Sequence, residues 1–350
     1  MGKAYVYVGT NSIRGSQGIY TLSLDTGSGK MDVLGTAEAQ DSAYLCVNRD
    51  GSRLYAVMES LEYEGKKGGG AASYAIEDGR LKQTGKCYAG GGWPCHISLD
   101  PKEREVYVSV FRNGSWLIFQ TDGDGRLAEA KESFSYQDPN GRPSHIHAVV
   151  SDPAGKYLAV ADCGLDAVYL YNAVSHEQVW KEGFPEDAGP RQLSFSEDGK
   201  YLYLVTETSC ELYVMRYTPE EKEKLHVLQT ISTQRRDGYE GKNYAGGLHF
   251  HPSGKYLLAT NRGHNSFAVF SVDKENGMVK LLGHKMLAGD HCREFAFTLD
   301  GKILVAGLQH TDIVQSFFFD EETGKITDTG YQLNIPSPSA VTVFEKETEE

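Results

Sequence analysis

The chain has 350 residues, of which 40% are hydrophobic and 24% are charged, a composition typical of soluble globular proteins. A formal net charge of −13 argues against general binding to nucleic acid or to anionic membranes, because both are themselves negatively charged. The opening MGKAYVYVGT has no signal-peptide core, and no apolar run approaches the roughly 20 residues of a membrane helix. Six cysteines without a CxxC pair favour reduced thiols in a cytoplasmic protein.

A turn followed by an apolar strand recurs seven times along the chain. In chain order the copies are MGKAYVYV, DGSRLYAV, DPKEREVYV, DPAGKYLAV, EDGKYLYL, HPSGKYLL and LDGKILVA. The reference position in the turn is glycine in every copy but one, at Gly2, Gly51, Glu103, Gly155, Gly199, Gly254 and Gly301. Successive spacings between these positions are 49, 52, 52, 44, 55 and 47 residues, which indicates a repeat architecture.

Each repeat contains three further strand patterns. An alternating run follows the turn strand, as in GIYTLSLD or SFAVFSVD, then a more polar segment such as KMDVLGTAEA, and a short apolar strand such as CHISL precedes each turn. Four strands per unit and seven units predict an all-β, seven-bladed β-propeller with four antiparallel strands per blade. The chain begins at the second strand of a unit, and residues 337–344, SPSAVTVF, supply a lone first strand, so we expect the two to pair and close the ring. We expect one domain over residues 1–345 and a frayed acidic tail over 346–350.

One face of the predicted ring carries the longer connections. Antiparallel pairing places the tight turns, such as DPAG and EDGK, on one face and the other connections on the opposite face. The second set includes the long segments 59–70, 132–144 and 232–246. Long irregular loops collected on one side predict that this face is the functional one.

Equivalent positions in successive repeats predict which side chains meet near the axis at that face. Eight residues before the reference position lie Ala43, Cys95 (or His96, if a bulge shifts the register), His147, Arg191, Gly246 and Arg293. Eight residues after it lie Thr10, Glu59, Phe111, Cys163, Glu207, Arg262 and Gln309. Ten residues before it lie Asp41, Trp93, His145, Gly189, Tyr244 and His291. Because these positions collect Arg, His and Glu where packing alone needs small or apolar residues, they predict a pocket.

The segment GRPSHIHAVV contains two histidines, His145 and His147, whose direction the strand pattern predicts. Side chains alternate along a strand, so we expect His145 and His147 to point to the same side, toward the axial mouth. A metal held by this pair would need Glu207 or Glu59 as a further ligand. The second pair, His249 and His251, lies on the order of 10 Å further along its strand and does not share an ion with the first. We therefore expect no metal.

The residue types at the mouth favour a particular chemistry. Arginines bind phosphate or carboxylate through a bidentate fork, and a histidine beside them transfers protons near neutral pH. Glu207 can orient that histidine or take a proton itself. With water as nucleophile and arginines on the oxyanion, such a set hydrolyses an activated ester or lactone. The chain has no G-x-S-x-G elbow, P-loop or dinucleotide fingerprint, so we expect no cofactor. The structural alternative is a filled channel with an Arg191–Glu207 salt bridge.

Several segments resemble a known family. YVYVGTNSIRGSQGIYTLSLDTGSGKM, RPSHIHAVVSDPAGKYLAVADCGLDAVYLY, GPRQLSFSEDGKYLYLVTE, NRGHNSFAVFSVD and IPSPSAVTVF are similar, in this order, to blocks of the propeller-type 6-phosphogluconolactonases and fungal carboxymuconate cyclases. The resemblance spans nearly the whole chain. It implies that His147 is the catalytic histidine, that Arg191 and Glu207 act beside it, and that Arg262 matches a further arginine.

From the residues and the resemblance together we expect hydrolysis of a sugar lactone, 6-phosphogluconolactone, in the pentose phosphate pathway. The expected substrate is a small anionic sugar lactone, with no nucleic-acid or membrane partner. Two alternatives are a lactonising cycloisomerase for an unsaturated diacid and a non-catalytic propeller that binds a partner through its rim. The expected catalytic residues are His147, Glu207 and Arg191, and the expected substrate-binding residues are Arg262, Arg293, His145, His291, Trp93 and Glu59.

Overall fold

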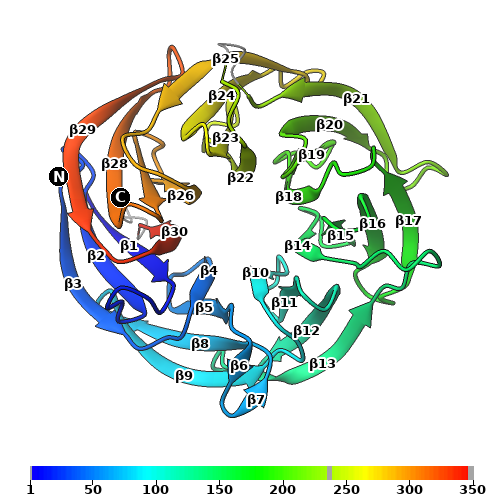
Figure 1. The fold of residues 1–350 in the computed structure, drawn as a ribbon, viewed down its shortest axis with the longest axis horizontal. Helices are drawn as coiled ribbons and strands as arrows, with labels where there is room; N and C mark the ends of the chain where they lie inside the picture. Colours follow the sequence, from blue (N-terminus) through cyan, green and yellow to red (C-terminus); the bar gives the residue numbers. More distant parts are fainter. Residues whose placement is uncertain (1, 235–238, 346–350) are drawn as a thin grey trace.

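The chain forms a ring of seven four-stranded antiparallel sheets around one axis (Figure 1). The computed structural model describes residues 2–234 and 239–345. The predicted all-β, seven-bladed propeller is therefore confirmed, whereas the tail expected to fray, 346–350, lies outside the described residues. Within the described ranges, no helix is long and apolar enough to span a membrane.

The two inner strands of each blade line and surround the axis. From blade 1 to blade 7, the innermost strands are β30 (Pro338–Phe344), β4 (Ser42–Val47), β10 (Pro94–Leu99), β14 (Ile146–Ser151), β18 (Pro190–Phe195), β22 (Tyr244–Phe250) and β26 (Cys292–Phe297). The second strands, in the same order, are β1 (Lys3–Thr10), β5 (Arg53–Met58), β11 (Glu105–Val110), β15 (Tyr157–Asp162), β19 (Tyr201–Thr206), β23 (Tyr256–Arg262) and β27 (Ile303–Leu308). Most second strands are buried along nearly their whole length, as their continuous apolar sequences require.

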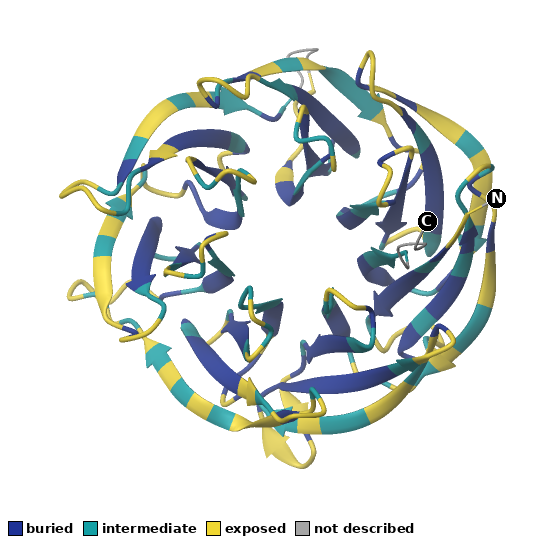
Figure 2. Cartoon of the chain, turned by 180° about the vertical axis from the view of Figure 1, so that it is seen from behind, coloured by how far each residue is buried: buried dark blue, intermediate teal, exposed yellow. Residues whose placement is uncertain are grey.

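The two outer strands complete each blade. The third strands are β2 (Ile19–Asp25), β8 (Gly70–Glu77), β12 (Ser115–Thr121), β16 (Ala167–Asn172), β20 (Glu211–Tyr217), β24 (Ser266–Val272) and β28 (Ile313–Asp320). The outermost strands are β3 (Met31–Ala37), β9 (Arg80–Tyr88), β13 (Leu127–Ser135), β17 (Gln178–Gly183), β21 (Leu225–Ser232), β25 (Val279–Met286) and β29 (Lys325–Asn334). Figure 2 shows that the outermost strands alternate between exposed and less exposed residues, whereas the inner strands are buried.

The hydrophobic core lies between the blades. The described residues form seven buried clusters, and each is shared by two neighbouring blades. Tyr203 and Leu212 of blade 5, for example, pack with Leu257 and Phe270 of blade 6. Because both faces of every sheet are covered in this way, the ring holds its neighbouring blades at fixed positions around the axis.

The ends of the described chain close the ring. Strand β1 pairs with β30 in the predicted antiparallel arrangement, with Tyr5 opposite Phe344 and Val8 opposite Val341. The cluster between blades 1 and 7 includes Val6 and Val305, so the closing blade packs on both sides like the others. Closure gives β1 a hydrogen-bonded partner on both sides, so blade 1 has the same four-stranded order as the other blades.

The repeated turn has the same backbone in different blades. Gly155 has a φ of 65° and donates its N–H to the carbonyl of Asp152 at 2.9 Å. Glu103, the one exception to glycine, has a φ of 57° and donates to Asp100 at the same distance. The left-handed region is open to glycine but costly for other residues, which explains why glycine predominates here.

The long connections differ from expectation in detail. Residues 59–70 contain a short hairpin, β6 (Glu62–Tyr63) and β7 (Lys66–Lys67). The expected loop 132–144 is shorter at its start, because β13 continues to Ser135. Part of the segment 232–246 lies outside the described residues.

Every innermost strand carries a β-bulge near its start. In each blade the register between the first and second strand shifts at one place. The residues left without a partner there are Ser339, Ala43, Cys95, His147, Arg191, Gly246 (with Gly247) and Arg293. A bulge re-aims the side chain of its extra residue. Apart from Ser339, these residues make up the column predicted eight residues before the reference position.

Candidate functional site

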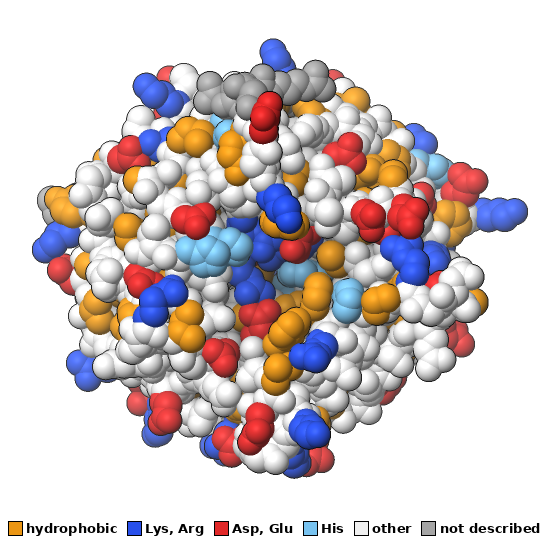
Figure 3. Space-filling view, viewed as in Figure 1, with side chains coloured by type: hydrophobic (Ala, Val, Ile, Leu, Met, Phe, Trp, Pro, Cys, Tyr) orange, Lys and Arg blue, Asp and Glu red, His pale blue; other side chains and the backbone are white. Residues whose placement is uncertain are grey.

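The bulge residues and the ends of the second strands meet at the axis on the face with the long connections. Figure 3 shows this face hollowed at the centre, with basic, acidic and histidine side chains gathered around the hollow. We call this hollow the mouth. Four of its residues, His147, Arg191, Glu207 and Arg262, come from three neighbouring blades.

Glu207 lies between the other three residues of this group. Its Oε2 accepts a hydrogen bond from Arg191 Nε at 3.0 Å, and its Oε1 lies 3.2 Å from Arg262 Nη2. The Glu207 backbone is fixed as well, because its N–H donates to Gly189 O at 2.6 Å and its carbonyl accepts from Ala245 N at 2.9 Å. The ion pair that the structural alternative expects between Arg191 and Glu207 is thus present, and Arg262 shares it.

The two arginines are almost fully enclosed. Arg191 is 3% exposed and Arg262 is 8% exposed. Burial, together with the charge of Arg191, lowers the pKa of Arg262 to about 10, so the side chain remains charged at neutral pH. Burial opposes ionisation of Glu207, but Arg262, Arg191 and Arg293 outweigh it and hold the pKa of Glu207 below its ordinary value. The group is therefore two cations around one carboxylate.

His147 lies against this carboxylate as a neutral ring. Its Nε2 is 4.0 Å from Glu207 Oε2, which is too long for a direct hydrogen bond. Burial and the charges of Arg191 and Arg293 hold the pKa of His147 well below its ordinary value. The ring consequently keeps a free lone pair at neutral pH, which a general base needs.

Two polar atoms in the mouth have no partner among the described residues. His147 Nδ1 and Arg262 Nε are both buried and make no hydrogen bond. Unsatisfied buried polar groups are rare in native proteins and call for an explanation. Both side chains adjoin Glu207 through their other nitrogens, which makes this part of the mouth the candidate place for a ligand.

Arg293 and Glu59 form a separate pair. Arg293 Nη1 and Nη2 donate to Glu59 Oε2 and Oε1 at 2.7 and 2.8 Å, a bidentate geometry. Blade 1 stands between their blades, and its bulge residue, Ser339, is small, as is Thr10 at the end of its second strand. The charge of Glu59 outweighs burial and raises the pKa of Arg293.

The structure replaces the regular strand expected at His145 and His147 with a bulge. The strand begins at Ile146 and bulges at His147, so alternation along a regular strand does not relate the two histidines. His145 Nδ1 lies 2.9 Å from Phe111 O, and its ring stacks on the Phe111 ring with centroids 4.6 Å apart. The Phe111 ring also meets the His147 ring edge-on at 5.9 Å. His145 thus packs on Phe111, which the repeat places near the axis but which is absent from the expected catalytic and binding residues.

His291 and Trp93 occupy equivalent positions just before their innermost strands. Both have left-handed backbones, with φ of 65° and 60°. His291 stacks on His310 with centroids 4.1 Å apart, and burial together with Arg262 lowers its pKa to about 3. Trp93 is 39% exposed on the rim of the mouth.

A second polar layer lies one residue further along the innermost strands. Cys95 is the bulge residue of its blade, whereas His96 lines a cavity with Tyr44 and Gln192. Glu294 Oε1 is 2.5 Å from His249 Nε2, which explains why this histidine does not belong to the first pair. Sequence reasoning missed this layer, because only the bulge brings two consecutive residues toward the axis.

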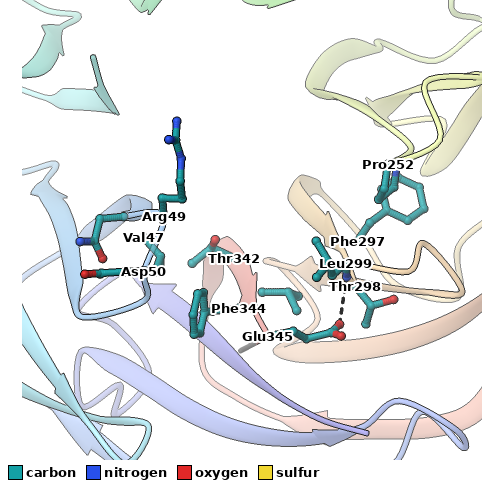
Figure 4. A pocket seen from close by; sticks show the side chains of 12 residues that line it. Val47, Arg49, Asp50, Pro252, Phe297, Thr298, Leu299, Thr342, Phe344 and Glu345 are labelled. Carbon is teal, nitrogen blue, oxygen red and sulfur yellow. Dashed lines mark hydrogen bonds between the residues drawn. The ribbon is translucent and has the colours of Figure 1, made fainter. Parts of the chain in front are cut away.

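The turn face has a cavity of its own, whereas the described residues hold no metal cluster. Within the described residues, no three His, Cys, Asp or Glu side chains are grouped so that they could hold a metal ion. The turn face has a cavity of about 600 Å³ lined by residues such as Arg49, Phe297 and Phe344 (Figure 4). None of the predicted site residues lines it.

Two proteins named 6-phosphogluconolactonase are similar to this chain over nearly its whole length. The chain is 28% identical over 352 residues to the 6-phosphogluconolactonase of Bacillus subtilis, covering 97% of this chain and 98% of the relative. It is also 28% identical to the 6-phosphogluconolactonase of Formosa agariphila, over 93% of this chain and 95% of the relative.

Among solved structures, the periplasmic gluconolactonase of Pseudomonas aeruginosa superposes with a TM-score of 0.90 at 28% identity, covering 98% of this chain and 99% of that one. The family model described as lactonase, 7-bladed beta-propeller, matches residues 5–343. The resemblance noted in the sequence is thereby confirmed. The chain belongs to the lactonase family of seven-bladed β-propellers.

Proposed function

We propose that the protein hydrolyses a sugar lactone, 6-phosphogluconolactone, to 6-phosphogluconate, a step of the pentose phosphate pathway. Membership of the lactonase family supports the reaction class, that of a carboxylic ester hydrolase. The names of the two curated relatives support the phosphorylated substrate. The observation that carries the proposal is a neutral His147 4.0 Å from a carboxylate that two buried arginines hold in place.

His147 is the proposed general base. His147 Nε2 and Glu207 Oε2 are 4.0 Å apart, so a water to one side of the pair can contact both atoms. As this water attacks the lactone carbonyl, His147 takes its proton, and the imidazolium that forms is stabilised by the adjacent carboxylate. The depressed pKa keeps the ring unprotonated at neutral pH, and the approach of a negative substrate raises it toward the working range.

The arginines are the proposed electrostatic partners of the reaction. Attack on the carbonyl carbon places negative charge on the carbonyl oxygen, and Arg262 Nε has a donor that no described group uses. Arg191 fixes Glu207 and contributes positive charge. When the ring C–O bond breaks, the proton on His147 passes to the leaving sugar oxygen, which completes the conversion of lactone and water to the open-chain acid.

The other predicted site residues receive supporting roles in this proposal. Arg293 and Glu59 neutralise each other and keep the rest of the mouth positively charged. His145 supports the wall formed by Phe111, whereas His291 and Trp93 contact the sugar from opposite sides of the rim. The reaction needs no cofactor, because water, a base and charge stabilisation are sufficient for an ester as reactive as a lactone.

We also propose a cytoplasmic location and the absence of nucleic-acid and membrane partners. All six cysteines are described, and each is a free thiol, which is typical of reducing compartments. The Pseudomonas aeruginosa relative is named as periplasmic, so cell fractionation is the appropriate test for this chain.

A pH-stat assay with freshly prepared 6-phosphogluconolactone tests the proposed activity, because the product is an acid. We expect acid release above the spontaneous rate, in proportion to protein concentration. His147→Gln should remove most of it, whereas His226→Gln on the outermost strand of blade 5 serves as the matched control. A rate equal to the spontaneous background at every protein concentration would overturn the proposal. An unsaturated diacid in the same assay tests the cycloisomerase alternative.

A further inference from the structure

The buried arginines of the mouth are poorly placed to hold the substrate phosphate. Arg191 and Arg262 share Glu207, and Arg293 is engaged by both oxygens of Glu59. A phosphate ester at the far end of a sugar also lies well beyond the lactone carbonyl. The group that binds it must therefore stand apart from the groups that act on the carbonyl.

The rim between blades 2 and 3 has such a group. The Arg112 guanidinium lies over the Trp93 ring, 5.2 Å from its centroid. Other described arginines of this rim have carboxylate partners, since Arg14 pairs with Asp312 and Arg142 with Asp166. Arg112 forms no such pair with a described carboxylate. Stacking on an aromatic face leaves the in-plane N–H donors of a guanidinium free for an anion.

The platform is held rigidly beside the catalytic group. Trp93 N donates to Ser60 O at 3.1 Å, and Trp93 O accepts from Phe111 N at 3.0 Å. Arg112 N donates to Gly92 O at 3.1 Å. Because Arg112 follows Phe111, whose ring contacts His147, the platform and the proposed base are linked through one short segment.

Trp93 occupies a position whose left-handed backbone recurs in other blades. Its φ of 60° is unfavourable for a bulky residue, and the equivalent position in blade 5 is Gly189, with a φ of 72°. The equivalent residues Ser337, Asp41 and His291 are left-handed as well, so the conformation belongs to the repeated connection. What distinguishes blade 3 is the large aromatic side chain, 39% exposed and therefore available to a ligand. In Figure 3, hydrophobic and basic side chains lie together beside the central hollow.

We infer that Trp93 and Arg112 form the subsite for the phosphorylated end of the lactone, with the sugar against the indole and the phosphate on the guanidinium. The inference rests on the proposed function and adds a determinant of specificity to it. The platform selects a phosphorylated lactone over its unphosphorylated counterpart, although both present the same carbonyl to His147.

The test compares kcat/KM for 6-phosphogluconolactone and for unphosphorylated gluconolactone in the wild type and in Arg112→Met, Arg112→Lys and Trp93→Gly. The wild type should prefer the phosphorylated lactone. Arg112→Met should lower the ratio of the two kcat/KM values by at least about tenfold, the usual effect of losing a charged hydrogen bond. Arg112→Lys should retain more of the ratio, and Trp93→Gly should raise KM for both lactones. Arg216→Met, an exposed arginine on β20, is the matched control.

The outcomes separate the two proposals. A ratio that Arg112→Met leaves at the wild-type value overturns the inference while the proposed function stands. A wild type that favours the unphosphorylated lactone overturns both the inference and the phosphorylated substrate, while lactone hydrolysis itself stands. A wild type that hydrolyses neither lactone above the spontaneous rate overturns the proposed function, and the inference fails with it.

Discussion

The variant Glu207→Gln removes the carboxylate that Arg191 and Arg262 share. Both arginines are more than 90% buried, and removing one partner of a buried ion pair typically destabilises a protein by about 3–5 kcal/mol. The Glu207 side chain is 24% exposed and glutamine retains one acceptor oxygen, so we expect about 2–3 kcal/mol. The assay is urea denaturation followed by fluorescence, with Glu197→Gln, an exposed glutamate of the same blade, as the control.

The same variant should gain sensitivity to anions. With Glu207 neutral, inorganic phosphate can bind the two unpaired arginines in the folded state and should recover part of the lost stability. The wild type should respond much less, because its arginines are already paired. Wild-type stability in Glu207→Gln, together with no specific response to phosphate, would refute the description of the mouth as two buried cations around one carboxylate.

Three further predictions concern pH and the second ion pair. Burial lowers the pKa of His96 to about 3, so below pH 6.5 the unfolded chain binds a proton that the folded chain excludes, and stability falls as pH falls. At pH 5 the free energy of unfolding should be about 2 kcal/mol lower because of His96 alone. Urea titrations at pH 7 and pH 5 should therefore show a smaller loss of stability in His96→Gln than in the wild type. The depressed pKa of His147 predicts that kcat/KM stays constant from pH 7.5 down to at least pH 6.5, and a decline centred above pH 6.5 would contradict its assignment as a neutral base. Arg293→Met and Glu59→Gln should each destabilise the fold, whereas the double variant should cost less than their sum, as a double-mutant cycle measures; full additivity would argue against the bidentate pair.

The repeat made the fold and most of the mouth predictable. Seven copies of one turn fix the blade count, and the position of each residue relative to Gly155 or its equivalents determines its depth along the axis. Even the exception, Glu103, adopts the left-handed turn of the glycines, so counting from it gave the right position for Phe111. Each copy of the turn is a short local sequence, so the repeat can be found in the sequence without knowledge of long-range contacts.

The arrangement of side chains within the mouth could be predicted only in part. The sharing of Glu207 by two arginines depends on the rotamers of long side chains, which the repeat does not determine. Arg293 reaches Glu59 across blade 1, where the bulge residue Ser339 and the strand end Thr10 carry small side chains. Arg293 and Glu59 are 234 residues apart, so no local sequence pattern indicates that they pair.

The bulge accounts for the remaining differences. It places His147 at the axis and ends the simple alternation that would have placed His145 beside it. It also brings His96 and Glu294 into a second layer, one residue beyond Cys95 and Arg293. In the sequence a bulge is only a one-residue ambiguity of register, whereas in the structure it directs the site residues inward.

The central claim is that residues of separate blades combine into one hydrolytic site. The most direct measurement is acid release from 6-phosphogluconolactone by the wild type and by His147→Gln, with both proteins shown to be folded by their urea midpoints. The account predicts rapid hydrolysis by the wild type and a loss of at least about a hundredfold in kcat for the variant. Equal rates in the two folded proteins would contradict it.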